Sequence, residues 1–277
     1  MKPLIHRVVD LHARRILPAE VAVGDGRIEA IRPLDPDALV APGLLLPGFV
    51  DAHVHVESSM LPPAEFARVA VRHGTVATVS DPHEIANVLG EAGLDFMLED
   101  AARACMPIHF GVPSCVPATD FETAGDSLDS TAVARLLEDD RFRYLSEMMN
   151  WPGVLHGDPE VMAKIAAAKR LGKPVDGHAP GLRGEDAVRY AAAGITTDHE
   201  CFSLEEARDK AKAGMKILIR AGSAARNLEA IWPILAEFPQ LAMFSTDDAH
   251  PDDLLTGHLD RMVARCVAHG VDVFDVL

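Results

Sequence analysis

Two histidines close a short apolar segment near the start of the chain. The segment reads Pro47-Gly48-Phe49-Val50-Asp51-Ala52-His53-Val54-His55. In a β-strand, residues two apart point to the same face, so His53 and His55 would lie side by side on one rigid element. Two neighbouring imidazoles suit a divalent metal ion, although a packed pair of histidines is the simpler alternative. A metal site requires further ligands at the ends of later strands.

Other ionisable residues follow the later candidate strands. They are Asp81, His83 and Glu84, then Glu147, then Asp176 and His178, then Asp198, His199 and Glu200, and finally Asp247 and Asp248. Buried ionisable groups are costly unless they are paired or bind a metal. Four histidines, a carboxylate in a bridging place and one further aspartate fit two divalent ions better than one. Taken singly, His178 or His199 could be a core histidine, and Asp247 or Asp248 a helix cap.

The elements that would position these residues alternate between strands and helices. Candidate strands cover residues 48–55, 75–80, 108–112, 142–147, 174–178, 195–199, 215–219 and 241–246, and helical patterns run through 66–73, 159–168, 185–193 and 204–213. This alternation predicts an α/β fold with a parallel sheet. Eight units match a closed (β/α)8, TIM-like barrel, in which the carboxyl ends of the strands form the site. An open doubly wound sheet is the alternative, but the chain has neither a G-x-G-x-x-G nor a Walker motif.

Residues 1–46 predict a small separate β domain in front of the barrel. Apolar residues of period two flank Asp25-Gly26, which is a hairpin signal, and residues 5–9 and 39–40 add extended segments. We expect an incomplete antiparallel sheet over 1–46 and the metal-binding barrel over 47–277.

Composition excludes several classes of partner. The 42 acidic and 26 basic side chains give a formal charge of -16, which argues against nucleic acid or an anionic membrane. No apolar stretch reaches the roughly 18 residues of a membrane span, and no signal peptide is evident. The 4 cysteines are scattered without a C-x-x-C pair, as expected for reduced thiols in a cytoplasmic protein.

Five further segments, together with residues 48–55 and Glu57-Ser58-Ser59-Met60, carry a family resemblance. They include Asp81-Pro82-His83-Glu84-Ile85-Ala86-Asn87, Pro113-Ser114-Cys115-Val116-Pro117-Ala118-Thr119, Asp176-Gly177-His178-Ala179-Pro180-Gly181, Gly222-Ser223-Ala224-Ala225-Arg226-Asn227 and Thr246-Asp247-Asp248-Ala249-His250-Pro251-Asp252-Asp253. The chain resembles the adenine deaminases of the amidohydrolase superfamily over nearly its whole length.

The resemblance implies a site and a reaction. Two divalent ions, manganese or iron with zinc as a further candidate, would be held by His53, His55, Glu147, His178, His199 and Asp247. The choice of Asp247 over Asp248 rests on the family habit that the ligand follows a small hydroxyl residue. The catalytic residues would be Asp247, Glu147, His83 and Glu84, and the substrate-binding residues Glu57, Ser114 and Arg220. The implied reaction is hydrolysis of adenine, a small purine, to hypoxanthine and ammonia by a metal-activated hydroxide, in a homo-oligomer.

The chain departs from the family pattern in two respects. It has Arg220-Ala221-Gly222-Ser223 where comparable enzymes have Arg-Glu-Gly-Ser, which leaves a carboxylate role there unfilled. Those enzymes are also considerably longer, so we expect the chain to be an N-terminal portion. The alternatives are another hydrolase of the superfamily, acting on a cyclic amide or N-acyl bond, and a non-catalytic truncated metal-binding chain.

Overall fold

The computed structural model describes residues 3–119 and 121–277, which form two compact units. One unit covers the described residues up to Gly48 together with Leu277, and the other covers Phe49–Val276. No helix in the described ranges combines the length and apolar content that a membrane crossing needs.

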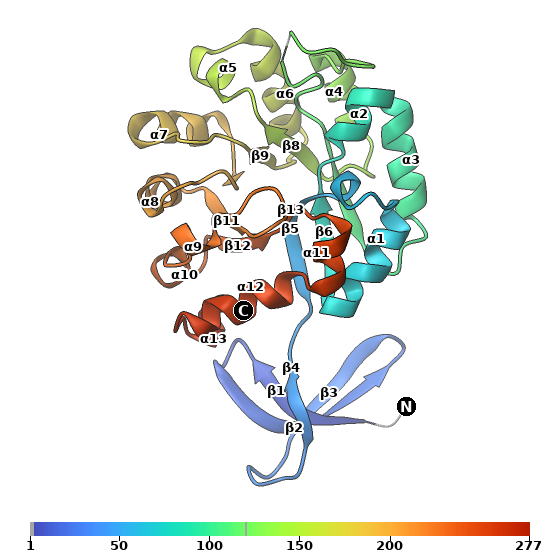
Figure 1. Ribbon diagram of the computed structural model, residues 1–277, viewed down its shortest axis with the longest axis vertical. Coiled ribbons are helices and arrows are strands. Elements are labelled where there is room, and N and C mark those ends of the chain that lie inside the picture. The colour runs from blue at the N-terminus through green and yellow to red at the C-terminus, as the bar shows by residue number, and fades with distance from the viewer. Residues whose placement is uncertain (1–2, 120) are drawn as a thin grey trace. The chain divides into compact units, whose positions relative to one another are not determined.

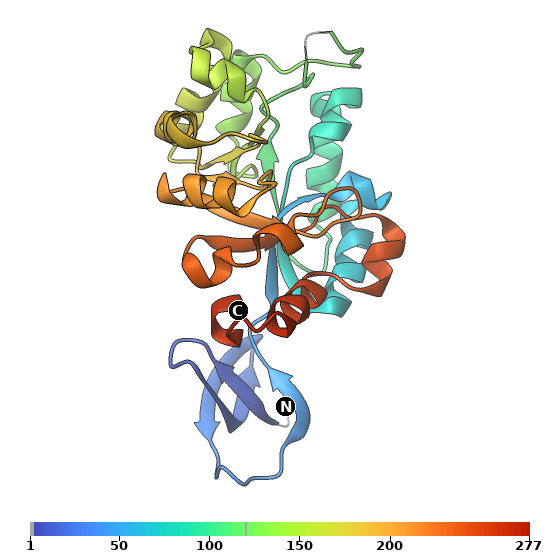
Figure 2. The same cartoon turned by 60° about the vertical axis from the view of Figure 1, so that its left-hand side comes forward.

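The first unit is a four-stranded sheet with the order β3-β2-β1-β4, drawn in blue in Figures 1 and 2. Its strands are β1 (Leu4–Asp10), β2 (Arg15–Gly24), β3 (Arg27–Pro33) and β4 (Ala41–Leu45). The predicted hairpin at Asp25-Gly26 joins β2 to β3, and both turn residues have positive φ. The expectation of a wholly antiparallel sheet is wrong, because residues 34–40 cross to the free edge of β1 and β4 then runs parallel to β1. Residues 39–40, expected to be extended, precede that strand.

The second unit alternates strands with helices, as predicted. Its strands are β5 (Phe49–His55), β6 (Thr75–Ser80), β7 (Ile108–Val112), β8 (Tyr144–Met148), β9 (Val175–Gly177), β10 (Thr197–Asp198), β11 (Lys216–Arg220), β12 (Ala242–Ser245) and β13 (Asp247–Asp248). Its helices are η1 (Val56–Ser59), α1 (Pro63–Ala70), η2 (Val71–His73), α2 (His83–Leu89), α3 (Glu91–Ala101), α4 (Ser130–Leu137), α5 (Trp151–His156), α6 (Pro159–Arg170), α7 (Gly184–Ala193), α8 (Leu204–Lys212), α9 (Leu228–Ile231), α10 (Ile234–Glu237), α11 (Pro251–Thr256), α12 (Leu259–Ala268) and α13 (Val273–Val276). Figure 1 shows the helices of this unit outside its strands.

Neighbouring strands of the second unit are consecutive in the chain, except that the last strand, β13, pairs with β5, the first strand of this unit. One sheet has the order β13-β5-β6-β7-β8-β9 and the other β10-β11-β12, and every ladder is parallel. Only Thr246 separates β12 from β13, so one short stretch of chain pairs with β11 on one side and β5 on the other. Between β9 and β10 a backbone bond joins the sheets, with Thr196 N donating to Val175 O over 2.9 Å. All carboxyl ends of these parallel strands therefore point the same way.

Local sequence signals explain where the helices begin. Pro159 stands at the first turn of α6, and the Asp158 side chain caps it by accepting from the amides of Glu160 and Val161. Ser203 caps α8 in the same manner. Apolar side chains of helices and strands share one buried core, with Phe66, Ile165 and Tyr190 from the helices and Phe110 and Leu145 from the strands.

Gly177 allows β9 and β10 to approach closely. A Cβ atom at this position would lie 2.4 Å from the backbone oxygen of Thr197 and 2.6 Å from Cγ2 of Ile195. We expect Gly177→Ala to lower the free energy of unfolding by about 1–3 kcal/mol, because the backbone must move to relieve the overlap. Urea denaturation followed by circular dichroism measures this change.

The control is Gly24→Ala, whose added Cβ meets only the flexible side chain of Glu29. Its effect should stay within about 0.5 kcal/mol. Equal denaturation midpoints for wild type and Gly177→Ala would contradict the close approach of β9 and β10.

Candidate metal centre

The end of β5 brings His53 and His55 together, as the alternation of a strand requires. Both are buried, and their Nε2 atoms lie 3.0 Å apart. The Nδ1 atom of His53 lies 2.8 Å from Oδ2 of Asp176, and Nδ1 of His55 lies 3.1 Å from the backbone oxygen of Asp81. Oxygen acceptors behind Nδ1 fix the imidazoles so that both Nε2 atoms face a common centre, an arrangement typical of metal-binding histidines.

Glu147, at the end of β8, lies between two pairs of imidazoles. Its Oε1 atom is 3.3 Å from Nε2 of His55 and 3.2 Å from Nδ1 of His83. Its Oε2 atom is 2.6 Å from Nδ1 of His178 and 3.2 Å from Nε2 of His199. The two oxygens of one carboxylate thus face different histidine pairs, which is the geometry that a bridging carboxylate needs.

Asp247 completes the ring of donors from the end of the last strand. Its Oδ1 atom lies 3.3 Å from Nε2 of His55 and 3.9 Å from Nε2 of His53. Its backbone has a positive φ of 58°, a conformation that is costly for a residue other than glycine. The neighbouring Asp248 instead accepts a hydrogen bond from Ser58. Geometry therefore favours Asp247 over Asp248 as a donor to the centre.

These side chains fit divalent cations. Three sets of donor atoms, each within 4.8 Å of one another, are His53, His199 and Asp247; Glu147, His178 and His199; and His55, Asp81, His83 and Glu147. Two imidazole nitrogens 3.0 Å apart cannot both be lone-pair acceptors, so the contact between His53 and His55 requires a proton or a cation. Separations near 3 Å are also those expected between ligands bound to one ion at about 2.1 Å.

The shifted pKa values of His53, Glu147 and Asp247 indicate that the cluster requires positive charge. Burial alone would lower the pKa of His53, but the Asp176 carboxylate raises it to about 9. Burial opposes ionisation of Glu147, yet hydrogen bonds from His178 and His199 hold its pKa well below the usual range. Burial would raise the pKa of Asp247, but its hydrogen bond with His55 and the nearby imidazoles of His199 and His53 together lower it. The carboxylates stay ionised and call for cations between them, either protons or metal ions.

The expected substrate-binding residues Glu57, Ser114 and Arg220, and the expected catalytic residues His83 and Glu84, fall into two groups. Glu57, His83 and Glu84 lie together at the rim, where Oε1 of Glu84 is 3.2 Å from Nδ1 of His55 and 3.7 Å from Nε2 of His83. These three side chains are only partly buried. Burial and the Glu84 carboxylate raise the pKa of Glu57 to about 8.

Ser114 and Arg220 have protein partners instead. The Ser114 hydroxyl donates to the backbone oxygen of Glu147 over 2.5 Å. The buried Arg220 guanidinium makes a two-pronged contact with Glu200 and also bonds Oδ2 of Asp247. Both residues thus touch candidate metal ligands.

Asp51 links β5 to the segment between β12 and β13. The sequence analysis did not identify it as a site residue. Its Oδ1 accepts from the amides of His53 and Thr246, at 3.3 and 3.1 Å, and its Oδ2 accepts from the Thr246 hydroxyl over 2.5 Å. His258 lies 3.1 Å from Oδ2 and reaches Oγ1 of Thr75 with its other nitrogen, 2.6 Å away. These bonds fix the spacing between His53 and the residue after Thr246.

A buried ionic clamp holds the loops that follow His178 and His199. The Lys210 amine donates to Glu206 over 2.8 Å and to the backbone oxygen of Ala179 over 2.7 Å, and lies 3.0 Å from Asp198. All three charged side chains are almost fully buried. Burial would lower the pKa of Lys210, but Asp198 and Glu206 raise it, so the amine stays charged.

The two carboxylates of this clamp also bind backbone amides. Asp198 accepts from Ala179 and Glu200, and Glu206 accepts from Gly181 and Phe202. The clamp thereby holds the residues directly after His178 and after His199.

Comparison with known proteins places the chain in a family. Residues 44–272 match the Amidohydrolase family, to which the chain belongs. A solved N-acetyl-D-glucosamine-6-phosphate deacetylase from Mycobacterium smegmatis shares the fold, with a TM-score of 0.68 and 18% identity over 100% of this chain and 86% of that one. The fold is therefore of the TIM-like amidohydrolase type.

Several similar sequences within that family have the name adenine deaminase. A protein named adenine deaminase from Salinibacter ruber is 59% identical over 98% of this chain, and one from Methanosarcina mazei is 52% identical over 100%. The chain spans about half the length of these relatives, 49% and 50% respectively. A solved structure described as an adenine deaminase has a TM-score of 0.64 with 15% identity, covering 100% of this chain and 82% of that one. The resemblance stated from the motifs is confirmed.

Replacing Lys210 tests the buried ionic clamp that it forms with Asp198 and Glu206. We expect Lys210→Met to lower the free energy of unfolding by about 3–5 kcal/mol, because Asp198 and Glu206 would be left as buried unpaired charges. Lys212→Met is the control, since this lysine lies on the same helix and is exposed. Chemical denaturation of both variants is the measurement, and equal losses of stability would show that the clamp contributes nothing specific.

Proposed function

We propose that this chain hydrolyses adenine to hypoxanthine and ammonia at a binuclear metal centre. The observation that carries the proposal is the identity to relatives named adenine deaminase, 46% to 59% over at least 97% of this chain. The convergence of imidazoles and carboxylates at one end of the strands supports it independently.

Six residues would hold two divalent ions, manganese or iron, with zinc as a further candidate. They are His53, His55, Glu147, His178, His199 and Asp247. Such ions lower the pKa of a bound water so that hydroxide is available near neutral pH. Glu147 is assigned the bridging place, because its two oxygens face different histidine pairs.

Asp247 is assigned the proton transfers. Arg220 occupies its Oδ2 atom, which leaves Oδ1 facing the histidines of β5. Arg220 and the imidazoles keep this carboxylate ionised, so it can accept a proton from the attacking water. The water oxygen bonds to C6 of the purine, the bond from C6 to the exocyclic nitrogen breaks, and Asp247 returns the proton to the departing ammonia.

Half-buried groups at the rim would hold the purine ring. Glu57, His83 and Glu84 supply donors and acceptors beside the metal ligands without being sealed in the core. Ser114 and Arg220 are reassigned to positioning roles in this proposal, since their polar groups contact Glu147 and Asp247.

We also propose that the eight strand positions close into a (β/α)8 barrel over residues 47–277, with residues 1–46 as a separate domain. The support is the chain-order arrangement of the strands and the pairing of one short stretch with both β11 and β5.

Assay of this chain with adenine tests the function. After loading with Mn²⁺, ammonia release and loss of the adenine absorbance are expected with adenine, and not with dihydropyrimidines or N-acyl compounds. Turnover of one of the latter without adenine would favour another activity of the family. Bound metal with no turnover of any substrate would leave a metal-binding chain and contradict the proposal.

Removal of one first-strand imidazole should abolish both metal binding and turnover. His53→Ala deletes a donor from the set that also contains His199 and Asp247, so we expect fewer bound ions per chain and ammonia release at background. His156→Ala, which alters an exposed histidine, is the control. Metal analysis by mass spectrometry with the ammonia assay gives both readouts. Full activity in His53→Ala would refute the assigned centre.

A further inference from the structure

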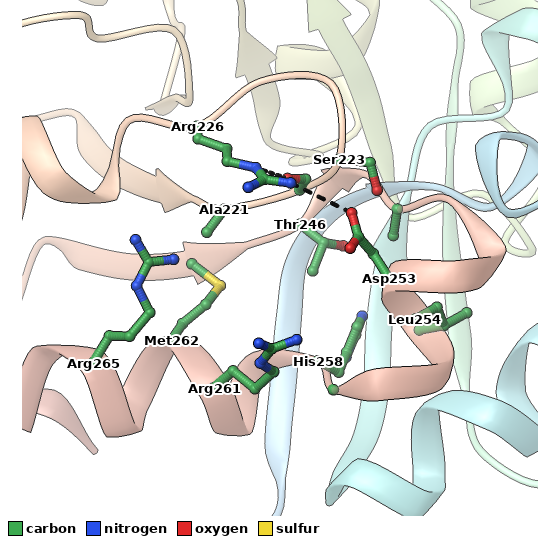
Figure 3. Close-up of a pocket in the computed structure, with 13 residues that line it drawn as sticks. Ala221, Ser223, Arg226, Thr246, Asp253, Leu254, His258, Arg261, Met262 and Arg265 are labelled. Carbon is green, nitrogen blue, oxygen red and sulfur yellow. Dashed lines mark hydrogen bonds and ion pairs between the residues drawn. The ribbon is translucent and has the colours of Figure 1, made fainter.

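A pocket of about 150 Å³ lies beside the last strand, apart from the metal ligands. Its walls come from the loop after β11, from α11 and from α12, and Figure 3 shows these side chains. A cavity of this size is large enough for a small molecule, since an engineered cavity of about 150 Å³ binds benzene. The proposed deaminase reaction uses none of the basic residues that line it.

Three arginines line the pocket. Figure 3 shows Arg226, from the loop after β11, across the pocket from Arg261 and Arg265 of α12. Arg226 pairs with Asp253 at 3.4 Å, and Arg265 pairs with Glu229. Arg261 donates to the Thr256 hydroxyl over 2.9 Å, and no carboxylate within the described ranges forms an ion pair with it. Among the residues that line the pocket there are thus three guanidinium groups and one carboxylate, that of Asp253.

This arrangement is unusual for the chain. The formal charge of the whole sequence is -16, so a gathering of arginines runs against its composition. Arg261 and Arg265 stand four residues apart on α12, a spacing at which like charges slightly disfavour a helix, and Glu229 offsets only the charge of Arg265. An anionic ligand in the pocket would remove that repulsion.

Hydrogen bonds and close packing fix the loop after β11, which carries Arg226. The amide of Ser223 donates to the backbone oxygen of Asp248 over 2.6 Å. The Asn227 side chain accepts from the amide of Arg220 over 2.7 Å and donates to the backbone oxygen of His199 over 3.1 Å. Gly222 packs so closely that a Cβ there would lie 1.9 Å from the oxygen of Thr246. One wall of the pocket is thus preformed, which reduces the cost of binding.

We propose that this pocket binds a phosphate group, either as free inorganic phosphate or as a small phosphomonoester. Guanidinium groups match phosphate oxygens in charge and geometry. A tetrahedral dianion offers oxygens in several directions and can meet arginines on two walls, whereas a planar carboxylate offers two oxygens in one plane. The site goes beyond the proposed deaminase activity and does not require it.

Titration calorimetry of this chain with sodium phosphate, in buffer of low ionic strength, tests the proposal. Saturable binding of one phosphate per chain is expected, and acetate should bind at least tenfold more weakly. Ribose 5-phosphate, titrated in parallel, distinguishes the two sources: binding as tight as that of phosphate identifies a phosphomonoester site, and weaker binding a site for the free ion.

Variants locate the site. Arg261→Ala and Arg265→Ala should each weaken phosphate binding at least tenfold, while Arg189→Ala, an exposed arginine on α7 paired with Asp186, should bind as wild type does. His53→Ala separates this site from the metal centre, because it should lose adenine turnover and keep phosphate binding. Absence of saturable phosphate binding, or wild-type affinity in both pocket variants, would overturn the proposal whether or not the chain deaminates adenine.

Discussion

The structure depends on one constraint, which is that its buried imidazoles and carboxylates need cations between them. His53, His55 and Glu147 are almost completely buried, and Nε2 of His55 lies 3.0 Å from Nε2 of His53 and 3.3 Å from Oε1 of Glu147. In water such groups would be independently solvated, whereas inside the protein each one is stable only with a compensating charge. Parallel strands gather them because all their carboxyl ends point the same way, and divalent ions would neutralise them there.

Three groups of buried polar residues hold those donors in place. Asp176 lies behind His53, Asp51 joins the first strand to the last, and the clamp around Lys210 secures the loops after two later histidines. These groups are themselves buried charges, so each needs its own set of hydrogen bonds. The candidate metal centre therefore has several hydrogen-bonded networks behind it, as metal sites generally require.

Sequence reasoning found residues whose signal is local and missed those whose partner is remote. The spacing of His53 and His55, and the place of His178 and His199 at strand ends, could be recognised from short segments. Asp176 lies in one of the motifs that carry the family resemblance, but its bond to His53 spans 123 positions. Lys210 lies in a highly charged helical segment, where no local pattern distinguishes it from a surface lysine, yet it is fully buried. The direction of β4 depended on a crossing connection that carries no pattern of its own.

The most direct test of the central claim is electron paramagnetic resonance of the chain titrated with Mn²⁺ after removal of bound metal. We expect uptake of two ions per chain and the multiline spectrum of an exchange-coupled pair, because Glu147 would connect the two ions. Uptake of no more than one ion, or the spectrum of isolated Mn²⁺ at saturation, would contradict the central claim.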